Sequence, residues 1–443
     1  MDLTQILPAL TGTAWTLVFF VIALSVIVAI HEYGHYIVGR WCGIHAEVFS
    51  IGFGPQIYAR TDKRGTIWQI AALPFGGYVK FLGDANAASV GSAEVTEADK
   101  RRTMLGAPVW ARALTVAAGP IFNFILAILI FAGYFMWQGT VKEPMTFGSA
   151  PDLPPGYVSE LQPGDEVLGI NGLNMLELGA RLTNTDLLPS AAAMDYLIRR
   201  DGDVITVSAP HPIMPLVETV HPRSAADDAG MRVGDFITHV NGTPVYALTD
   251  VSRIRDETNN QEMNLTVYRD GAELQLAMTP RRVDLPLPGG GFETRYLIGL
   301  SSSVYFEAET ESVGLWDGLK TGTSELWARI TTSLSGLWHL MTGAISSCNL
   351  SGPVAIAQTS GSMAEQGADN FILFIGILSA AVGLLNLFPI PVLDGGHLVF
   401  HAYEAVTRRK PSEAALRVLM TVGLAMVGSL MLFALLNDLV LCP

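Results

Sequence analysis

Four long uncharged stretches constrain this 443-residue chain more than any other feature. A helix needs about 20 apolar residues to cross the roughly 30 Å hydrocarbon core of a bilayer. The first stretch has no basic region before it and is too long for the apolar part of a signal peptide, so we interpret it as a retained span. The sequence therefore predicts a polytopic α-helical membrane protein with four transmembrane helices. The stretches cover residues 3–30, 113–141, 370–393 and 418–437.

The composition agrees with a membrane protein and excludes one class of partner. Charged residues make up 15% of the chain, against about 25% in soluble domains. The net charge of −14 argues against nucleic acid as the main partner, because phosphate binding needs a basic surface. The three cysteines, Cys42, Cys348 and Cys442, have no CxxC spacing, so neither a disulfide scaffold nor a thiolate zinc site is predicted.

Basic residues in the short connections predict the orientation of the spans. Nine Lys and Arg residues lie between the first and second stretches, and four lie between the third and fourth. The positive-inside rule places both connections in the cytoplasm. Both termini and the long segment 142–369 then face the opposite side of the membrane.

The long segment contains an internal repeat. Residues 163–172 and 233–242 each carry a Gly-Asp pair, a short apolar run and a final Asn-Gly pair, at an offset of 70 residues. Asn-Gly after a strand is typical of a β-hairpin. The pattern resembles PDZ domains, which bind an extended peptide by adding it to a sheet edge. The alternative is that the two modules are small β-domains that serve as a spacer.

A tryptophan-rich segment follows the two modules. Trp316, Trp327 and Trp338 are spaced eleven residues apart, which places them on one face of a helix. Such a face suits a helix lying in the membrane interface, and the alternative is a helix packed on the modules. Glycines argue against a single unbroken helix. These are Gly318, Gly322 and Gly336.

A metal-binding pattern ends the first span. His31, Glu32 and His35 form an HExxH motif, which puts two imidazoles on one helix face with a glutamate beside them. Ionisable groups within a span cost roughly 2.5–3.5 kcal/mol each, so such a cluster indicates a functional site. The alternative is that both histidines lie beyond the hydrocarbon and bind only water.

The third apolar stretch supplies a candidate third ligand. A catalytic zinc site has three protein ligands and one open position. Asp394 follows the third stretch, which runs in the same direction as the first, so we expect it at the level of the two histidines. Pro389 and Pro391 interrupt helical hydrogen bonding just before it, which membranes tolerate where protein or a watery cavity satisfies the backbone. A rival pair, interpreted as solvated or as partners of the ligands, consists of His397 and His401, with Glu404 after them.

Together these motifs resemble the site-2 protease family of intramembrane zinc metalloproteases. The motifs are HEYGH in the first span, the two PDZ-like modules, Leu-Ser-Gly-Pro at 350–353 and NLFPIPVLDGG at 386–396. The resemblance implies that His31, His35 and Asp394 bind Zn²⁺ and that Glu32 is the general base. It also implies that residues 51–80 contain a membrane-associated β-hairpin that pairs with an unwound substrate strand. The substrate-binding residues implied in this way are Asn386, Gly76, Gly77, Tyr78 and Val79.

The resemblance also implies partners and a location. The substrate would be a single-span membrane protein such as an anti-sigma factor, cleaved in regulated intramembrane proteolysis during a stress response. Peptide termini would bind the modules, which would act as a size gate. The chain would lie in the bacterial inner membrane, with the modules and termini in the periplasm and the active site near the cytoplasm. Two other classes remain open: a non-hydrolytic zinc-binding scaffold that recruits partners through the modules, and a metal transporter.

These inferences give one expected domain order. It is a first span with HExxH at 1–40, a cytoplasmic β-hairpin region at 41–112, a second span at 113–141, PDZ-like α+β domains at 142–212 and 213–285, a linker with interfacial amphipathic helices at 286–369, a third span with the LDG motif at 370–397, a cytoplasmic loop at 398–417, and the fourth span with the C-terminus at 418–443.

Overall fold

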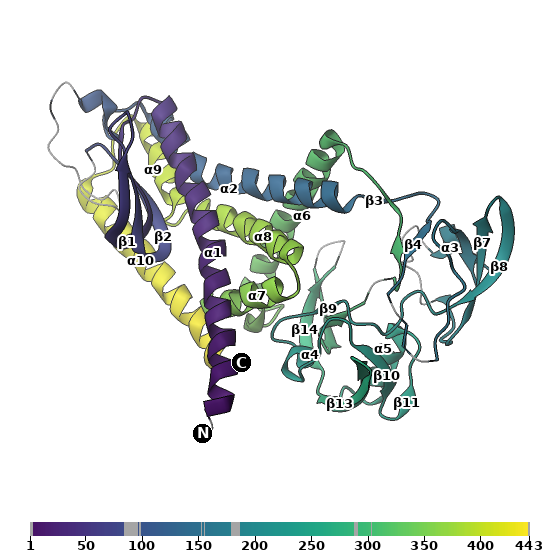
Figure 1. The fold of residues 1–443 in the computed structure, drawn as a ribbon. Helices are drawn as coiled ribbons and strands as arrows, with labels where there is room; N and C mark the ends of the chain where they lie inside the picture. The colour runs from purple at the N-terminus through teal and green to yellow at the C-terminus, as the bar shows by residue number, and fades with distance from the viewer. Residues whose placement is uncertain are drawn as a thin grey trace. The chain divides into compact units, whose positions relative to one another are not determined.

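The computed structural model divides the chain into two compact units, one formed by residues 1–134 and 315–443 and the other by residues 135–314. It describes residues 3–83, 96, 99–151, 153–154, 156–178, 187–287, 291–302 and 304–441, with only the backbone described for 3–11, 75 and 286. The helical unit contains the long α1, shown in Figure 1.

Four helices of the first unit are long and apolar enough to cross a membrane. They confirm the number of spans predicted from the sequence and define a polytopic membrane protein. The first span runs to Trp41 rather than to residue 30, and the third ends at Asn386 rather than at residue 393. Large apolar side chains stay exposed along them, such as Leu424 at 63%, which suits contact with lipid rather than water. The helices are α1 (Leu3–Trp41, apolar from Gly12), α2 (Val109–Gln138), α8 (Ala368–Asn386) and α10 (Glu413–Leu436), which continues into the π-helical η4 (Asn437–Leu441).

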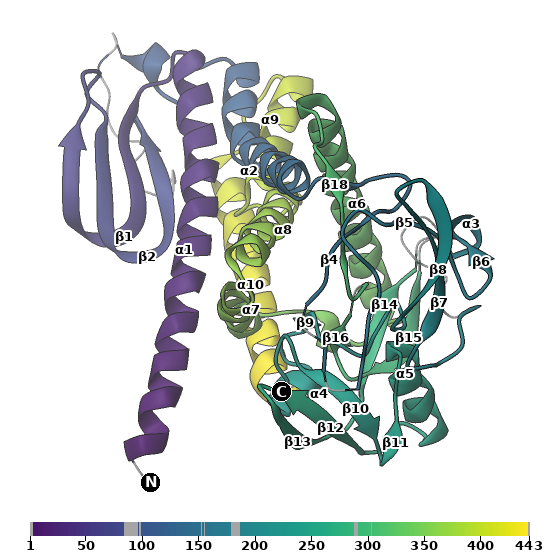
Figure 2. The ribbon, with the colours of Figure 1, turned by 45° about the vertical axis from the view of Figure 1, so that its right-hand side comes forward.

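A β-sheet lies beside the carboxyl-terminal half of α1 (Figures 1 and 2). It is built from β1 (Ala46–Thr61) and β2 (Ile67–Phe81), and each strand contributes two segments. Residues 46–51 lie between 77–81 on one side and 67–70 on the other, and 56–61 pair with 67–71. Residues 77–81 therefore form an edge of this sheet among the described residues.

Helix α7 (Pro353–Glu365) begins at the Leu-Ser-Gly-Pro motif and is capped from the other end of the sequence. The buried Asp438 carboxylate accepts hydrogen bonds from the N–H groups of Gly352, Val354 and Ala355 at 3.0–3.1 Å. A carboxylate at a helix N-terminus satisfies free N–H groups and complements the helix dipole. This contact ties the end of α10 to the start of α7.

The 3-10 turn η3 (Ser347–Asn349) precedes α7 and contains a disulfide-bonded cysteine. Cys348 forms this disulfide, whereas Cys42 is free, and Cys442 lies outside the described residues. The cysteine spacing had not predicted a disulfide.

Helix α6 (Leu315–Met341) is one continuous helix, so the expectation that its glycines interrupt it is wrong. Gly318, Gly322 and Leu326 lie on its buried face. A Cβ atom at Gly322 would lie 2.7 Å from the Ile128 carbonyl oxygen of α2, so the glycines permit close packing of α6 on α2. The tryptophans stay exposed: Trp316 at 78%, Trp327 at 67% and Trp338 at 62%.

The second unit contains the repeat as two four-stranded sheets with the same strand order. The first sheet has the order β6-β5-β7-β8 and the second has the order β11-β10-β12-β13. Each sheet covers its own cluster of buried apolar side chains. The first module is formed by β5 (Glu166–Ile170), β6 (Leu173–Asn174), α3 (Met175–Leu178), β7 (Met194–Arg200) and β8 (Asp203–Ala209), and the second by α4 (Ala225–Asp228), β10 (Phe236–Val240), β11 (Thr243–Pro244), α5 (Leu248–Glu257), β12 (Met263–Arg269) and β13 (Ala272–Met278).

The two modules agree in their turns and in their buried charges. The Asn-Gly pairs predicted to form hairpins have positive φ at both residues, 49° and 80° at 171–172 and 49° and 76° at 241–242, as a type I′ turn requires. Arg200 donates two hydrogen bonds to the buried Asp165 carboxylate, and Arg269 binds Asp235 in the same way. The repeat seen in the sequence is thus a structural repeat.

Short strands after the second module pair with strands that come earlier in the sequence of the second unit. Residues 300–311 pair with segments that precede each sheet, and a hairpin connects them to the second module. The elements are β3 (Thr140–Val141), β4 (Phe147–Ser149), β9 (Thr219–Val220), β14 (Arg281–Pro286), β15 (Phe292–Leu297), β16 (Leu300–Ser301), β17 (Glu307–Ala308) and β18 (Thr310–Glu311).

Candidate metal centre

Three donor atoms from distant parts of the sequence meet between α1 and the start of α9 (Asp394–Thr407). The Nε2 atoms of His31 and His35 lie 3.2 Å apart. The Oδ2 atom of Asp394 lies 3.1 Å from the first nitrogen and 3.5 Å from the second. The structure thus brings together the three residues that the sequence predicted as metal ligands.

This triangle fits a zinc ion. Ligand atoms bound tetrahedrally to zinc at about 2.0–2.1 Å are roughly 3.3 Å from one another, which matches the three distances between the side chains of His31, His35 and Asp394. Asp394 Oδ2 is buried and forms no hydrogen bond, so neither contact with an imidazole has hydrogen-bond geometry. A buried carboxylate oxygen without such a bond is costly unless a cation binds it, and His₂Asp is a donor set suited to zinc.

A sharp turn places Asp394. Helix α8 ends at Asn386 and α9 begins at Asp394, as expected from the helix-breaking prolines at 389 and 391. Gly395 and Gly396 let α9 start against this turn, because a Cβ atom at Gly395 would lie 2.3 Å from the carbonyl oxygens of Leu387 and Phe388. The turn therefore directs Asp394 toward α1.

Helix α2 holds the two imidazoles from the other side. His35 Nδ1 donates to the Thr115 carbonyl oxygen at 2.9 Å, which leaves Nε2 free to bind a metal. His31 Nδ1 lies 3.2 Å from the side-chain amide of the buried Asn123. A metal on His31 Nε2 leaves the proton on Nδ1, which then donates a hydrogen bond. The Asn123 amide oxygen accepts this bond when the nitrogen and oxygen of the Asn123 amide exchange places. Both ligands therefore have a partner on α2.

A glycine on α2 makes this contact possible. A Cβ atom at Gly119 would lie 2.4 Å from His35 Nε2 and 2.8 Å from His31 Cε1. At the neighbouring positions of the same interface, a Cβ atom at Gly34 would lie 2.5 Å from the Ala118 carbonyl oxygen. The helices α1 and α2 are therefore in close contact at the metal centre.

Glu32 lies between the histidines and the sheet edge. Its side chain is half-buried. Gly77 packs directly on it, since a Cβ atom there would lie 3.4 Å from Glu32 Cγ and 3.0 Å from Val28 Cγ1. The edge segment that begins at Gly77 thus passes beside the metal centre. Gly76, Tyr78 and Val79 lie in the same strand, β2.

Asn386 is the last residue of α8. Within the described part of the chain its side chain forms no hydrogen bond and is half-buried. The structure therefore places it on the turn that carries Asp394, without a direct contact that would fix its role.

A buried ion pair ties the far end of α9 to α2. Arg112 donates two hydrogen bonds to Glu404, at 2.8 and 2.9 Å, and these bonds lower the pKa of the Glu404 carboxyl. Burial and then the nearby Arg112 lower the pKa of His401 to about 4. His397 and His401 are not part of the three-donor group found among the described residues, and our interpretation of them as solvated residues or partners of the ligands stays a prediction.

The fold and the site define a membrane-embedded zinc metalloprotease. The sequence matches the model of peptidase family M50 over residues 19–430. The chain belongs to this family, the site-2 protease family.

Named relatives agree with this assignment. A protein of Agrobacterium fabrum named as a zinc metalloprotease is 36% identical over 426 residues, which cover 95% of this chain and 94% of the relative. The regulator of sigma-E protease RseP of Escherichia coli is 31% identical over 454 residues, which cover 96% and 98% of the two chains. The regulator of sigma E protease of Haemophilus influenzae is also 31% identical, with the same coverage.

Sequence reasoning missed the contribution of α2 to the site. Thr115, Gly119 and Asn123 were not singled out, because an apolar span does not reveal which face meets which helix. Asn123 carried the one usable signal, since a polar amide inside an apolar span is costly unless it has a partner.

Proposed function

We propose that this chain hydrolyses a peptide bond within or next to the transmembrane segment of a single-span membrane protein. The observation that carries the proposal is the triangle of His31 Nε2, His35 Nε2 and Asp394 Oδ2, with edges of 3.1–3.5 Å. It lies on α1, beside α2, and both helices are long and apolar enough to cross a membrane. A soluble substrate would not reach such a site as readily as one already in the bilayer.

The residues of the site divide the chemistry between them. Zinc, when bound by His31, His35 and Asp394, supplies a Lewis acid that polarises the scissile carbonyl and acidifies water. Glu32 accepts the proton from the attacking water and passes it to the leaving amide nitrogen. Asn386 is proposed to hold the substrate backbone, because its amide has no partner among the described residues.

The substrate must unwind before cleavage, because a helix engages its carbonyl groups in internal hydrogen bonds. Free backbone groups in lipid cost several kcal/mol each, and pairing with a strand edge offsets this cost. The segment that starts at Gly76 and Gly77 and runs through Tyr78 and Val79 is a suitable edge beside Glu32. Helix-breaking residues in the substrate span should therefore speed cleavage. Equal cleavage rates with and without them, at full zinc occupancy, would count against strand pairing.

We infer that the carboxyl end of α1 faces the cytoplasm of a bacterial cell and that both termini and the repeat modules face the periplasm. The basic connections support this orientation. The disulfide at Cys348 supports it independently, because disulfides persist in oxidising compartments such as the periplasm. Two relatives are named regulators of sigma-E, and this role in sigma-factor control supports an anti-sigma factor as the proposed substrate. The four apolar helices support the proposed location in the inner membrane.

The two repeat modules are proposed to act as PDZ-like domains that bind peptide termini and exclude substrates with bulky outer domains. Their four-stranded antiparallel sheets with exposed edges support peptide binding by strand addition. A chain that lacks residues 142–310 should cleave an untrimmed substrate that the full chain rejects. Loss of cleavage of a pre-trimmed substrate would count against a gate.

A Glu32→Gln chain tests the proposed function. In proteoliposomes it should retain zinc and lose cleavage of a single-span substrate, because the base is removed while the ligands stay. Glu413→Gln, an exposed change at the start of α10, is the matched control and should cleave normally. A non-hydrolytic scaffold or a metal carrier would not need Glu32. Those alternatives would be favoured if the wild type cleaved no substrate and if Glu32→Gln bound partners or transported metal as the wild type does.

A further inference from the structure

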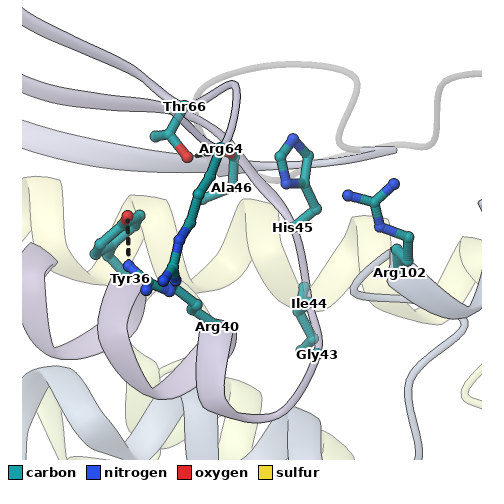
Figure 3. A pocket seen from close by; sticks show the side chains of 9 residues that line it. All are labelled: Tyr36, Arg40, Gly43, Ile44, His45, Ala46, Arg64, Thr66 and Arg102. Atoms are coloured by element: carbon teal, nitrogen blue, oxygen red, sulfur yellow. Dashed lines mark hydrogen bonds between the residues drawn. The ribbon is translucent and has the colours of Figure 1, made fainter. Parts of the chain in front are cut away.

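A basic cavity lies at the carboxyl end of α1, away from the metal centre. It has a volume of about 210 Å³ and nine lining residues, none of which is acidic. Arg40 comes from α1, His45 from the turn after it, Arg64 from the turn between β1 and β2, and Arg102 from η1 (Lys100–Arg102). Figure 3 shows Arg64 reaching from the sheet toward Arg40, and Arg102 pointing toward His45.

Two of these arginines have no carboxylate partner among the described residues. Arg40 donates only to the Tyr36 hydroxyl, at 3.4 Å, and Arg64 forms no side-chain ion pair. Asp62 lies nearby. One of its oxygens accepts from the backbone N–H groups of Arg64 and Thr66, at 2.8 and 3.0 Å, and the other accepts from the Tyr36 hydroxyl and the Trp68 indole N–H, both at 3.4 Å. Arg102 pairs with Asp99 at 3.0 Å. The cavity therefore keeps an excess of positive charge.

The chemistry of the cavity fits a phosphate group. Guanidinium groups bind phosphate oxygens with paired hydrogen bonds, and they do so better than ammonium groups. The volume is below the roughly 300 Å³ at which sites for drug-sized ligands begin. It suits a phosphate with a small substituent rather than a nucleotide.

The position of the cavity indicates where the phosphate comes from. Arg40 is the second-last residue of the α1 span, and Trp41 beside it is 72% exposed. Tryptophan and basic residues at a span end mark the depth of lipid headgroups, and basic pockets at this depth bind anionic lipids. We propose that this cavity binds the phosphate of an anionic phospholipid and thereby joins the end of α1 to the β1–β2 sheet.

Lipid retention by the full-length protein tests this proposal. The protein is extracted from mixed phosphatidylglycerol and phosphatidylcholine vesicles, and bound lipid is counted by native mass spectrometry. The wild type should retain phosphatidylglycerol. The R40Q/R64Q variant should bind phosphatidylglycerol at least about tenfold more weakly. The control R60Q/R101Q removes the same charge from exposed positions of the same segment outside the cavity, and it should match the wild type. Equal retention by R40Q/R64Q and the wild type would overturn the proposal.

Two further measurements complete the test. Zinc content and thermal unfolding report whether R40Q/R64Q is folded. If it is not folded, the R64Q variant replaces it in the lipid comparison. R64Q should fold, because Arg64 is exposed on a turn. The protein in phosphatidylcholine nanodiscs is titrated with inorganic phosphate, which shows whether the cavity binds a free anion as well as a lipid headgroup. Phosphate binding that R40Q/R64Q abolishes, without phosphatidylglycerol retention, would support the phosphate site but contradict the lipid as its source.

Discussion

The Oδ2 atom of Asp394 lies 3.1 Å from the Nε2 atom of His31, although the two residues come from opposite ends of the chain. Two helix termini, one on either side of the inserted second unit in the sequence, thus build one site. The site depends on how closely α2 packs against both histidines, and this packing leads to the first two predictions.

Gly119→Ala should disrupt the metal centre. The added Cβ atom would lie 2.4 Å from His35 Nε2, so the imidazole or the helix must move. We expect about a 10- to 100-fold loss of zinc affinity, measured by competition with a chelator. Gly133→Ala in the same helix is the matched control, since a Cβ atom there has nothing within 4 Å. Similar affinities for the two variants would show that the close approach at Gly119 is unimportant.

Asn123 should act as a positioning residue for His31. Asn123→Ala removes the acceptor for the Nδ1 proton, and zinc affinity should fall about tenfold or more. Asn123→Asp keeps an acceptor and should retain most of the affinity. Thr421→Ala, an exposed change on α10, controls for altering a polar residue in a span. If the Asp and Ala variants lost affinity equally, Asn123 would matter for packing rather than for orienting the imidazole.

The repeat modules should lose stability in acid. Burial alone would raise the pKa of Asp165, but hydrogen bonds from Arg200 and the Gln162 N–H outweigh it and lower the pKa below the usual 3.8. The contribution of this carboxylate is therefore complete above about pH 4 and is lost as the pH falls through the lowered value.

Hydrogen exchange of β5 and β7 in the full-length protein measures this effect. Asp165→Asn should destabilise the first module by about 1–3 kcal/mol at pH 7, the cost of losing hydrogen bonds to a buried group, and should flatten the decline below about pH 4. Asp203→Asn, at an exposed position without a buried partner, should leave both unchanged. A full acid-induced decline in Asp165→Asn would assign the effect to other groups.

Local patterns predicted the parts of this protein that depend on local physics. The HExxH spacing places His31 and His35 on one helix face, and the Asn-Gly pairs predict hairpins because only certain residues adopt positive φ readily. The direction of the spans placed Asp394 at the level of the histidines.

What the sequence did not predict depends on packing between distant elements. Gly322 was expected to weaken α6, but it is buried against α2, where a missing side chain favours close packing. The cap that Asp438 provides to α7 joins residues more than 80 positions apart, and no local pattern indicates it. Thr115 and Asn123 belong to the same class, because an apolar span does not specify its neighbours.

The zinc content of the purified full-length chain tests whether His31, His35 and Asp394 form a zinc site. We expect about one zinc ion per chain in the wild type and in Glu32→Gln, and loss of tightly bound zinc in Asp394→Ala and His35→Ala. An Asp394→Ala chain that bound zinc with wild-type affinity would contradict this expectation.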